Sequence, residues 1–420
     1  MNSSRVNGRT VMKKNVMIVG IGAQGSTVAR FIDNEPNTGM ILCADQDKDA
    51  VDNVVANLRN GKGVILDGTD SDAIANAAKD YDIDIMVSGM PLEIGKGVME
   101  AAMKAKTCYQ DFCAPYGYDD NDWADGFRYI SNECSRKFKE AGKSAVCATG
   151  SAPGVICVAA LKTMRYLDTC NTINLMVYEG VVSKRFMPFW WSPLTALDGM
   201  AHPSWAYENG KIIRTGGFTR PIRRYFEELG KEAEFYEHAH GEAVYIGLNA
   251  DKYFKGVKNV YFKYGGSGMD FARPLFVSGL LSREPELIDG QQVIPFNVIL
   301  KHLPPAPKFR HEIKEIIDEG LISDSGAMVV EATGTKEGKR ITVETHVMAP
   351  GMIESFERSG LTAEMYLTGQ GGAIFTKMLL NDVIREPGVI SSAMLNDEQV
   401  NCYERCANEL GIRFETHVKE

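Results

Sequence analysis

The sequence lacks a long hydrophobic run. Its longest apolar stretch, around residues 152–161, is interrupted by proline and glycine and is shorter than the about 20 residues that a helix needs to cross a bilayer. An excess of positive charge is also missing, because 46 Lys and Arg stand against 55 Asp and Glu, for a formal net charge of −9. Nucleic acids and anionic membranes are bound by basic faces. We therefore expect neither as a partner.

A disulfide framework is missing as well. The nine cysteines are odd in number and scattered, and Cys43, Cys147 and Cys157 have apolar neighbours, where a free cysteine behaves as a small hydrophobic residue. This usage favours a reducing compartment, so we expect a cytoplasmic protein. The polar residues 1–13 lack the apolar core of a secretory signal, and we expect them to form a disordered extension.

The chain has enough apolar residues for a large core, since 44% of its 420 residues are hydrophobic. Across residues 14–150, short apolar segments alternate with helical patterns, which is typical of a doubly wound parallel sheet, the Rossmann type of α/β fold. Residues 151–364 carry alternating β-branched segments without regular helices between them, which predicts an inserted α+β domain with a mostly antiparallel sheet. Residues 365–420 return to the α/β pattern, and we assign them to the first domain.

A glycine motif lies between the first strand and the first helix. In Gly20-Ile21-Gly22-Ala23-Gln24-Gly25, the first glycine permits a tight turn, the second lets the backbone approach a diphosphate, and the third permits close helix–strand packing. Asp45 ends the second strand, where a carboxylate meets the adenosine ribose hydroxyls. The sequence therefore predicts a site for a nicotinamide dinucleotide. NAD is favoured over NADP, because Asp45 would repel a 2′-phosphate unless Lys48 or Lys62 compensates.

Two further loops follow strands at the same edge of the predicted sheet. Ligands of such sheets bind at the carboxyl ends of the strands. We expect Asp67 and Thr69 to flank the adenine, and Ser88 and Gly89 to pass under the nicotinamide ribose. The alternative role for such residues is to cap a helix, which applies above all to Asp70.

The fifth strand places three chemically active side chains on one face. Tyr109, Asp111 and Cys113 alternate along it and would face the nicotinamide. Asp111 could hold an amine or act as a base, with Tyr109 as a second catalytic candidate and Cys113 near the substrate. The alternative is a structural aspartate that caps the next loop.

Together these motifs resemble the saccharopine dehydrogenase family, including its saccharopine reductase-like, lysine 6-dehydrogenase-like and carboxynorspermidine dehydrogenase-like members. The matching segments are VGIGAQG, DGTD, VSGMP, YQD, ATGSAPGV, WWSP, ALDGMAHP and TGQGGAIFTKMLL, in that order along the chain. The resemblance implies an NAD(P)-dependent enzyme of amino-acid metabolism that acts on the C–N bond of an amino acid or opine-type secondary amine, with a lysine- or saccharopine-like substrate. It also implies a homodimer or larger assembly.

The inserted domain offers candidates for the substrate site. Trp190 and Trp191 would shape its cavity, unless they only pack in the core. Four arginines, Arg214, Arg220, Arg223 and Arg224, form a basic cluster from which at most one, with Arg224 as our choice, would bind a substrate carboxylate.

Histidines of the predicted inserted domain are further candidates. His202 is a candidate acid or base, against a structural role. His238 and His240 have the spacing of metal ligands, but no third ligand is identifiable, so we expect no metal.

Two functional alternatives remain open. The enzyme could run as a synthase that reductively condenses an aldehyde or keto acid with an amine. It could also be a non-catalytic protein that binds NAD without turnover.

Overall fold

The computed structural model describes residues 3–6, 9–116 and 122–419. The chain divides into two compact units. The first, which we call the nucleotide unit, contains residues 1–158 and 367–411, and the second, the sheet unit, contains residues 159–366 and 412–420.

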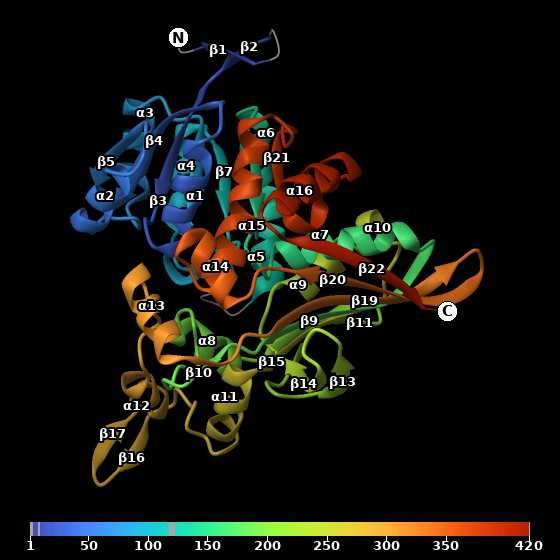
Figure 1. Ribbon diagram of the computed structural model, residues 1–420. Helices are drawn as coiled ribbons and strands as arrows, with labels where there is room; N and C mark the ends of the chain where they lie inside the picture. The colour runs from blue at the N-terminus through green and yellow to red at the C-terminus, as the bar shows by residue number, and fades with distance from the viewer. Residues whose placement is uncertain (1–2, 7–8, 117–121, 420) are drawn as a thin grey trace. The chain divides into compact units, whose positions relative to one another are not determined.

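The nucleotide unit is built on a seven-stranded parallel sheet in the order β21-β8-β7-β6-β3-β4-β5 (Figure 1). Its strands are β3 (Lys14–Val19), β4 (Thr38–Asp45), β5 (Gly61–Ile65), β6 (Ile85–Ser88), β7 (Cys108–Asp111), β8 (Ser144–Cys147) and β21 (Gly388–Ser391). The order reverses at the central strand β3, as in a Rossmann fold. The predicted fold class is therefore confirmed for this unit.

Helices connect these strands and cover the sheet. They are α1 (Ala23–Asp33), α2 (Lys48–Val55), α3 (Ser71–Asp80), α4 (Lys96–Ala105), α5 (Trp123–Tyr129), α6 (Ser135–Glu140), α7 (Val155–Thr163), α15 (Ala363–Leu380) and α16 (Asp397–Glu409), with the short helical turns η1 (Leu92–Ile94), η2 (Ile130–Cys134) and η4 (Ser392–Met394). α7 and α15 each run across a unit boundary. Residues 16–19, 41–44 and 85–87 are fully buried. Strands covered on both faces read as continuous apolar runs, which is why the sequence revealed them.

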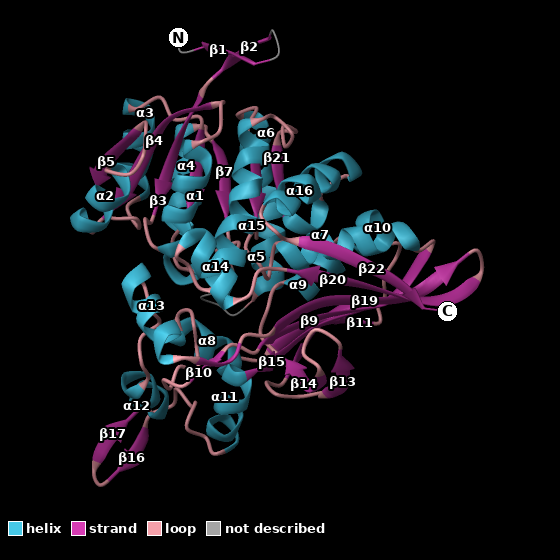
Figure 2. Ribbon diagram, viewed as in Figure 1, coloured by secondary structure: helices cyan, strands magenta, loops and turns pink. Residues whose placement is uncertain are grey.

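The sheet unit is dominated by one nine-stranded sheet (Figure 2). Its central path is β12-β11-β15-β9-β19-β20-β22, and β13 and β14 branch from β15. Among the described strand pairs of this sheet, β9–β15 is parallel and the others are antiparallel. The expected mostly antiparallel sheet is therefore confirmed. The strands are β9 (Thr169–Glu179), β11 (Ser204–Glu208), β12 (Lys211–Thr215), β13 (Ile222–Phe226), β14 (Lys231–Glu237), β15 (Asn259–Gly266), β19 (Gly326–Lys336), β20 (Lys339–Met348) and β22 (Arg413–Lys419).

Shorter elements complete this unit. The helices are η3 (Met164–Tyr166), α8 (Pro193–Ala201), α9 (Glu242–Leu248), α10 (Ala250–Tyr253), α11 (Ser267–Val277), α12 (Pro295–His302), α13 (Arg310–Glu319) and α14 (Met352–Ser359). Two small sheets pair β10 (Val182–Ser183) with β18 (Leu321–Ser323), and β16 (Glu286–Ile288) with β17 (Gln291–Val293). Within the described ranges, no helix is long and apolar enough to cross a membrane.

Both chain ends differ from expectation. β22 pairs antiparallel with β20, so this last strand lies in the sheet unit and not in the first domain. An alternating pattern identifies a strand but not its partner. Near the N-terminus, β1 (Ser3–Val6) and β2 (Arg9–Met12) form an antiparallel pair where we expected disorder. In the sequence, the dipeptide Asn-Gly at positions 7–8 favours a hairpin.

An ionic cluster stabilises the antiparallel part of the sheet unit. His346 on β20 contacts the carboxylates of Glu228 and Glu344, and Glu344 also accepts hydrogen bonds from Arg224 at 2.9 Å and Lys419 at 2.7 Å. Burial alone would lower the pKa of His346, but the two carboxylates raise it to about 9. The folded protein therefore holds the imidazolium form.

This raised pKa predicts a loss of stability at alkaline pH. Because the folded-state value exceeds the ordinary 6.5, the stabilisation is complete below about pH 6.5 and is lost as the pH rises through 9. It amounts to about 3 kcal/mol at most. His346→Gln should remove this dependence from the free energy of unfolding measured by urea denaturation between pH 6 and 10. His311→Gln, at an exposed histidine, is the control, and an unchanged pH profile in the His346 variant would contradict the prediction.

Candidate functional site

The glycine loop after β3 is closed by backbone packing. Gly20 adopts a left-handed φ of +88°, and its amide donates to the Ala44 carbonyl at 2.9 Å. A Cβ on Gly25 would lie 2.0 Å from the Gly20 carbonyl oxygen, and one on Gly89 would lie 2.4 Å from the same atom. Both glycines are therefore needed to bring α1 and the loop after β6 against the end of β3.

Gly22 lies on the open side of the same loop. It is the N-cap of α1, which begins with Ala23 and Gln24, and no side chain caps this helix. A Cβ on Gly22 would meet no atom within 4 Å in the part of the chain that the structure describes. An uncapped helix N-terminus with free space beside it is suited to a phosphate group. These residues fit the diphosphate of a nicotinamide dinucleotide.

Asp45, the last residue of β4, binds the backbone of the glycine loop through its carboxylate. Its Oδ2 accepts a hydrogen bond from the amide of Ile21 at 2.8 Å, and its Oδ1 accepts one from the amide of Asp47 at 3.0 Å. The carboxylate is half-buried, so it remains accessible at the carboxyl edge of the sheet. This is the position at which a ribose hydroxyl would be recognised.

The two neighbouring loops are ordered by their own side chains. Asp67 Oδ1 accepts hydrogen bonds from the amide and the hydroxyl of Thr69 at 2.8 and 2.7 Å, and these bonds lower the pKa of Asp67. Asp70 caps α3, which confirms the helix-capping role that we considered for it. Ser88 is buried at the end of β6, directly before Gly89.

Asp111 holds two turns together at the end of β7. Its carboxyl is only 3% exposed, and Oδ1 accepts hydrogen bonds from the amides of Ala114 at 2.9 Å and Ala148 at 2.8 Å. Both alanines have a left-handed φ, of +53° and +59°, a conformation that costs a non-glycine residue energy. The loop-capping interpretation accounts for these contacts. Catalytic roles for Asp111 and Tyr109, and a substrate contact for half-buried Cys113, stay predictions.

Asp111 Oδ2 and Tyr109 Oη are both buried at this end of β7. Burial raises the pKa of both groups. Between them on the strand, Gln110 Nε2 donates to Thr149 Oγ1 at 2.7 Å, and Gln110 Oε1 accepts a hydrogen bond from the Thr376 hydroxyl. This buried network ties β7 to α15, a role that sequence reasoning did not assign to Gln110.

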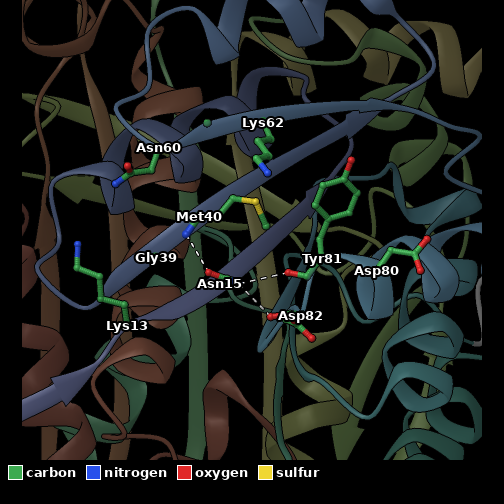
Figure 3. Close-up of a pocket in the computed structure, with 10 residues that line it drawn as sticks. Lys13, Asn15, Gly39, Met40, Asn60, Lys62, Asp80, Tyr81 and Asp82 are labelled. Carbon is green, nitrogen blue, oxygen red and sulfur yellow. Dashed lines mark hydrogen bonds between the residues drawn. The ribbon is translucent and has the colours of Figure 1, made fainter. Parts of the chain in front are cut away.

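A cavity of about 500 Å³ lies at the opposite edge of this sheet (Figure 3). Its lining comes from the amino ends of β3, β4 and β5 and from the turn after α3. Asn15 crosses it, since its Nδ2 donates to the carbonyls of Tyr81 and Asp82 and its Oδ1 accepts the Met40 amide. Ligands of doubly wound sheets bind at the carboxyl ends of the strands, so this cavity is not the nucleotide site.

The predicted substrate residues of the sheet unit do not gather at one place. Trp190 is 2% exposed and donates from Nε1 to the Val181 carbonyl at 2.9 Å, so core packing accounts for it. Its neighbour Trp191 is half-buried and donates from Nε1 to Glu179 Oε2 at 3.2 Å. His202 Nε2 lies 3.1 Å from Asp198 Oδ2 at the end of α8, which fits its structural alternative.

The arginines are engaged separately with groups of their own unit. Arg224 pairs with Glu331 at 2.7 Å and with Glu344 at 2.9 Å. Of the others, Arg214 lies over the Trp205 ring, Arg220 pairs with Glu208, and Arg223 pairs with Glu234. The four therefore do not present a shared site for a carboxylate.

His238 and His240 belong to an aromatic stack. The His240 ring lies 4.0 Å from that of Phe262, and the His238 ring lies 4.9 Å from that of Tyr264. Burial lowers the pKa of His238 well below its usual value. Among the residues described, no group of three or more His, Cys, Asp and Glu side chains has the arrangement to hold a metal ion.

Sequence reasoning missed an acidic cluster at the carboxyl end of the parallel pair β9–β15. Glu179 is the last residue of β9. Burial is the main cause that raises the pKa of Tyr264, and the carboxylates of Glu179 and Glu364 raise it further. Burial and the Glu179 charge raise the pKa of Glu364 to about 8. The sequence feature that could have identified Glu179 is the one that identified Asp45 and Asp111: each is an acidic residue at the end of a strand.

Comparison with known proteins identifies the nucleotide unit. Residues 16–146 match the model of the saccharopine dehydrogenase NADP binding domain. This confirms the resemblance to the saccharopine dehydrogenase family. Residues 16–146 therefore correspond to the NADP-binding domain of that family, which indicates an NAD(P)-dependent oxidoreductase. The family model does not settle which of the two nicotinamide dinucleotides is used.

Relatives of similar length agree with this family. The chain is 25% identical over 412 residues to a carboxynorspermidine synthase of Vibrio cholerae, covering 91% of this chain and 93% of the relative. It is 26% identical over 319 residues to a carboxynorspermidine synthase of Vibrio alginolyticus, covering 69% and 72%. The structure of a saccharopine dehydrogenase (L-Glu forming) from Saccharomyces cerevisiae matches with a TM-score of 0.67 at 15% identity, covering 97% and 100%. That last likeness shows a shared fold.

The glycine geometry predicts opposite outcomes for two similar substitutions. Gly25→Ala places a Cβ 2.0 Å from a backbone oxygen and should destabilise the protein by about 3 kcal/mol. Gly22→Ala meets no atom within 4 Å among the described residues and should leave the melting temperature unchanged. It should weaken NAD(P)H binding by roughly tenfold, because a Cβ blocks the close approach of a phosphate to the backbone.

Melting curves and quenching of NAD(P)H fluorescence measure the two effects. Equal behaviour of the two variants in both assays would contradict this assignment of the loop.

Proposed function

We propose that the protein catalyses hydride transfer at the C–N bond of an amino acid or opine-type secondary amine. The observation that carries the proposal is the closed glycine loop with its open face at Gly22 and the Asp45 carboxylate beside it. This geometry supports nicotinamide binding, and the dinucleotide supplies a hydride acceptor or donor. The names of the relatives, a saccharopine dehydrogenase and two carboxynorspermidine synthases, support a substrate with a secondary amine.

In this proposal the chain itself orients the reactants. The α1 N-terminus holds the diphosphate, Asp45 holds the adenosine ribose, and Ser88 and Gly89 lie under the nicotinamide ribose. Asp111 acts as a positioning residue, because its carboxylate fixes the turns that follow β7 and β8. Correct placement of the two reacting carbons accounts for a large part of the barrier lowering in such reactions.

The synthetic direction is the second candidate. Reductive condensation of an aldehyde or keto acid with an amine uses the same hydride transfer in reverse, acting on the imine that the two substrates form. It is favoured by the relative that matches over 91% of this chain, which is named a synthase.

A coupled assay decides between the directions and tests the proposal. We expect loss of NADH or NADPH absorbance when an amine and an aldehyde or keto acid are supplied together, and none with either compound alone. Opine-type secondary amines should reduce NAD or NADP in the reverse assay. Gly22→Ala is the control for nucleotide-dependent turnover. Tight NADH binding without turnover on a panel of amines, aldehydes and keto acids would favour the non-catalytic alternative.

The choice of cofactor depends on Asp45. We propose that NAD is preferred, because a carboxylate at this position repels a 2′-phosphate, although the matching family model is named for NADP. Asp45→Asn keeps an oxygen acceptor for the Ile21 amide but removes the charge. It should raise the ratio of kcat/KM for NADPH to that for NADH by about tenfold, the effect of one charge contact of about 1.4 kcal/mol. A wild-type preference for NADPH, or an unchanged ratio, would overturn this assignment.

A further inference from the structure

The cavity at the amino edge of the parallel sheet is large enough to hold a small molecule. Its volume of about 500 Å³ falls within the range of about 300–1,000 Å³ that is typical of ligand pockets. Its lining comes from the amino ends of β3, β4 and β5 and from the end of α3 (Figure 3). Because the glycine loop lies at the opposite, carboxyl edge of the same sheet, this cavity is a separate feature of the nucleotide unit.

Two lysines give one part of the cavity a positive charge. Lys13 directly precedes β3, and Lys62 is the second residue of β5. The Lys62 Nζ atom lies 5.5 Å from the centroid of the Tyr81 ring. Among the residues that the structure describes, neither lysine forms an ion pair, whereas the adjacent Lys14 pairs with Asp382 at 2.6 Å. Both ammonium groups are therefore available to an anionic group of a ligand.

The end of α3 gives another part of the cavity a negative charge. Asp80 is the last residue of α3, and Asp82 follows it by two positions. Carboxylates at the C-terminal end of a helix are unfavourable, because the helix dipole has its negative end there. In the described part of the chain neither aspartate forms an ion pair, whereas Asp72 at the start of the same helix pairs with Lys104 at 2.8 Å. An ammonium group of a ligand would compensate this negative charge.

Asn15 forms a fixed wall of the cavity. Its Nδ2 donates to the carbonyls of Tyr81 and Asp82 at 3.2 and 3.1 Å, and its Oδ1 accepts the Met40 amide at 3.0 Å. A Cβ on Gly39 would lie 2.5 Å from the same Oδ1, so the glycine makes room for this side chain. Asn15 therefore positions the turn after α3 against the start of β4, and its hydrogen-bonding groups are engaged with backbone.

The two kinds of charge select the class of ligand. Figure 3 shows Lys13 and Asp80 on opposite sides of Asn15. A ligand with only an anionic group would be repelled by the aspartates, and one with only a cationic group would be repelled by the lysines. An α-amino acid carries a carboxylate and an ammonium group on one carbon, so it can be attracted by both. Met40 and the Tyr81 ring supply apolar surface for its side chain.

We propose that the cavity at the amino edge of the sheet binds a free α-amino acid with an apolar side chain. The two lysines hold its carboxylate, Asp80 and Asp82 hold its ammonium group, and its side chain lies against the Tyr81 ring. The inference goes beyond the proposed function and does not depend on it. Strand β4 runs from Met40 in this cavity to Asp45 beside the glycine loop, which places the two sites at opposite ends of one strand.

Calorimetric titration of the whole protein with L-leucine tests the proposal without any turnover. Leucine should bind, whereas isoamylamine, which lacks the carboxylate, and isocaproate, which lacks the amino group, should each bind about tenfold more weakly. Lys62→Gln and Asp80→Asn should each weaken leucine binding by about tenfold for the same reason. Asp80→Asn should also keep or raise the melting temperature, because it removes a carboxylate from the negative end of α3.

Lys79→Gln is the matched control, because Lys79 is an exposed residue of α3 that does not line the cavity. It should leave leucine affinity unchanged. All three variants should bind NAD(P)H as the wild type does in the fluorescence assay, so a failure of the proposed hydride transfer is distinguished from a failure of this site. Absence of leucine binding to the wild-type protein, or wild-type affinity in both cavity variants, would overturn the proposal, the second result by placing leucine elsewhere in the protein.

Discussion

The carbonyl oxygen of Gly20 is the contact on which the nucleotide-binding loop depends. Gly25 from α1 and Gly89 from the loop after β6 both approach it so closely that a Cβ on either would overlap it. This packing brings the N-terminus of α1 to the end of β3 and leaves Gly22 facing open space. Close packing on one side of the loop therefore leaves the backbone accessible on its other side, where a phosphate can approach.

Strands β4, β7 and β9 each end in an acidic residue, and the three acids differ because their neighbours differ. Asp111 on β7 is saturated on one oxygen by two amides of left-handed alanines, so it stabilises backbone that would otherwise be strained. Asp45 on β4 accepts two amides but stays half-buried. Glu179 on β9 has an indole N–H and a second carboxyl near it. The contacts of an acidic residue at the end of a strand are therefore set by the neighbours that folding brings to it, and not by its position in the strand.

Those differences mark the limit of what the sequence could predict. The parallel sheet and glycine loop were predictable, because apolar runs and glycine spacing are local patterns. The pairing of β22 with β20 was not, because it joins segments far apart in the chain. Trp190 and Trp191 show the same limit at adjacent positions: one lies in a core and the other contacts a carboxylate. The influence of Glu179 on the pKa values of Tyr264 and Glu364 could not be predicted either, because the three residues are far apart in the sequence.

The distribution of charge changes the interpretation of the net charge of −9. An acidic chain with a local arginine cluster suggested that an arginine would bind a substrate carboxylate, but in the structure Arg224 is held by two glutamates of its own unit. Arg220 and Arg223 likewise pair with Glu208 and Glu234 of the same unit. A basic cluster in a sequence therefore does not predict a free cation, because folding can pair each arginine with a glutamate that is distant in the chain.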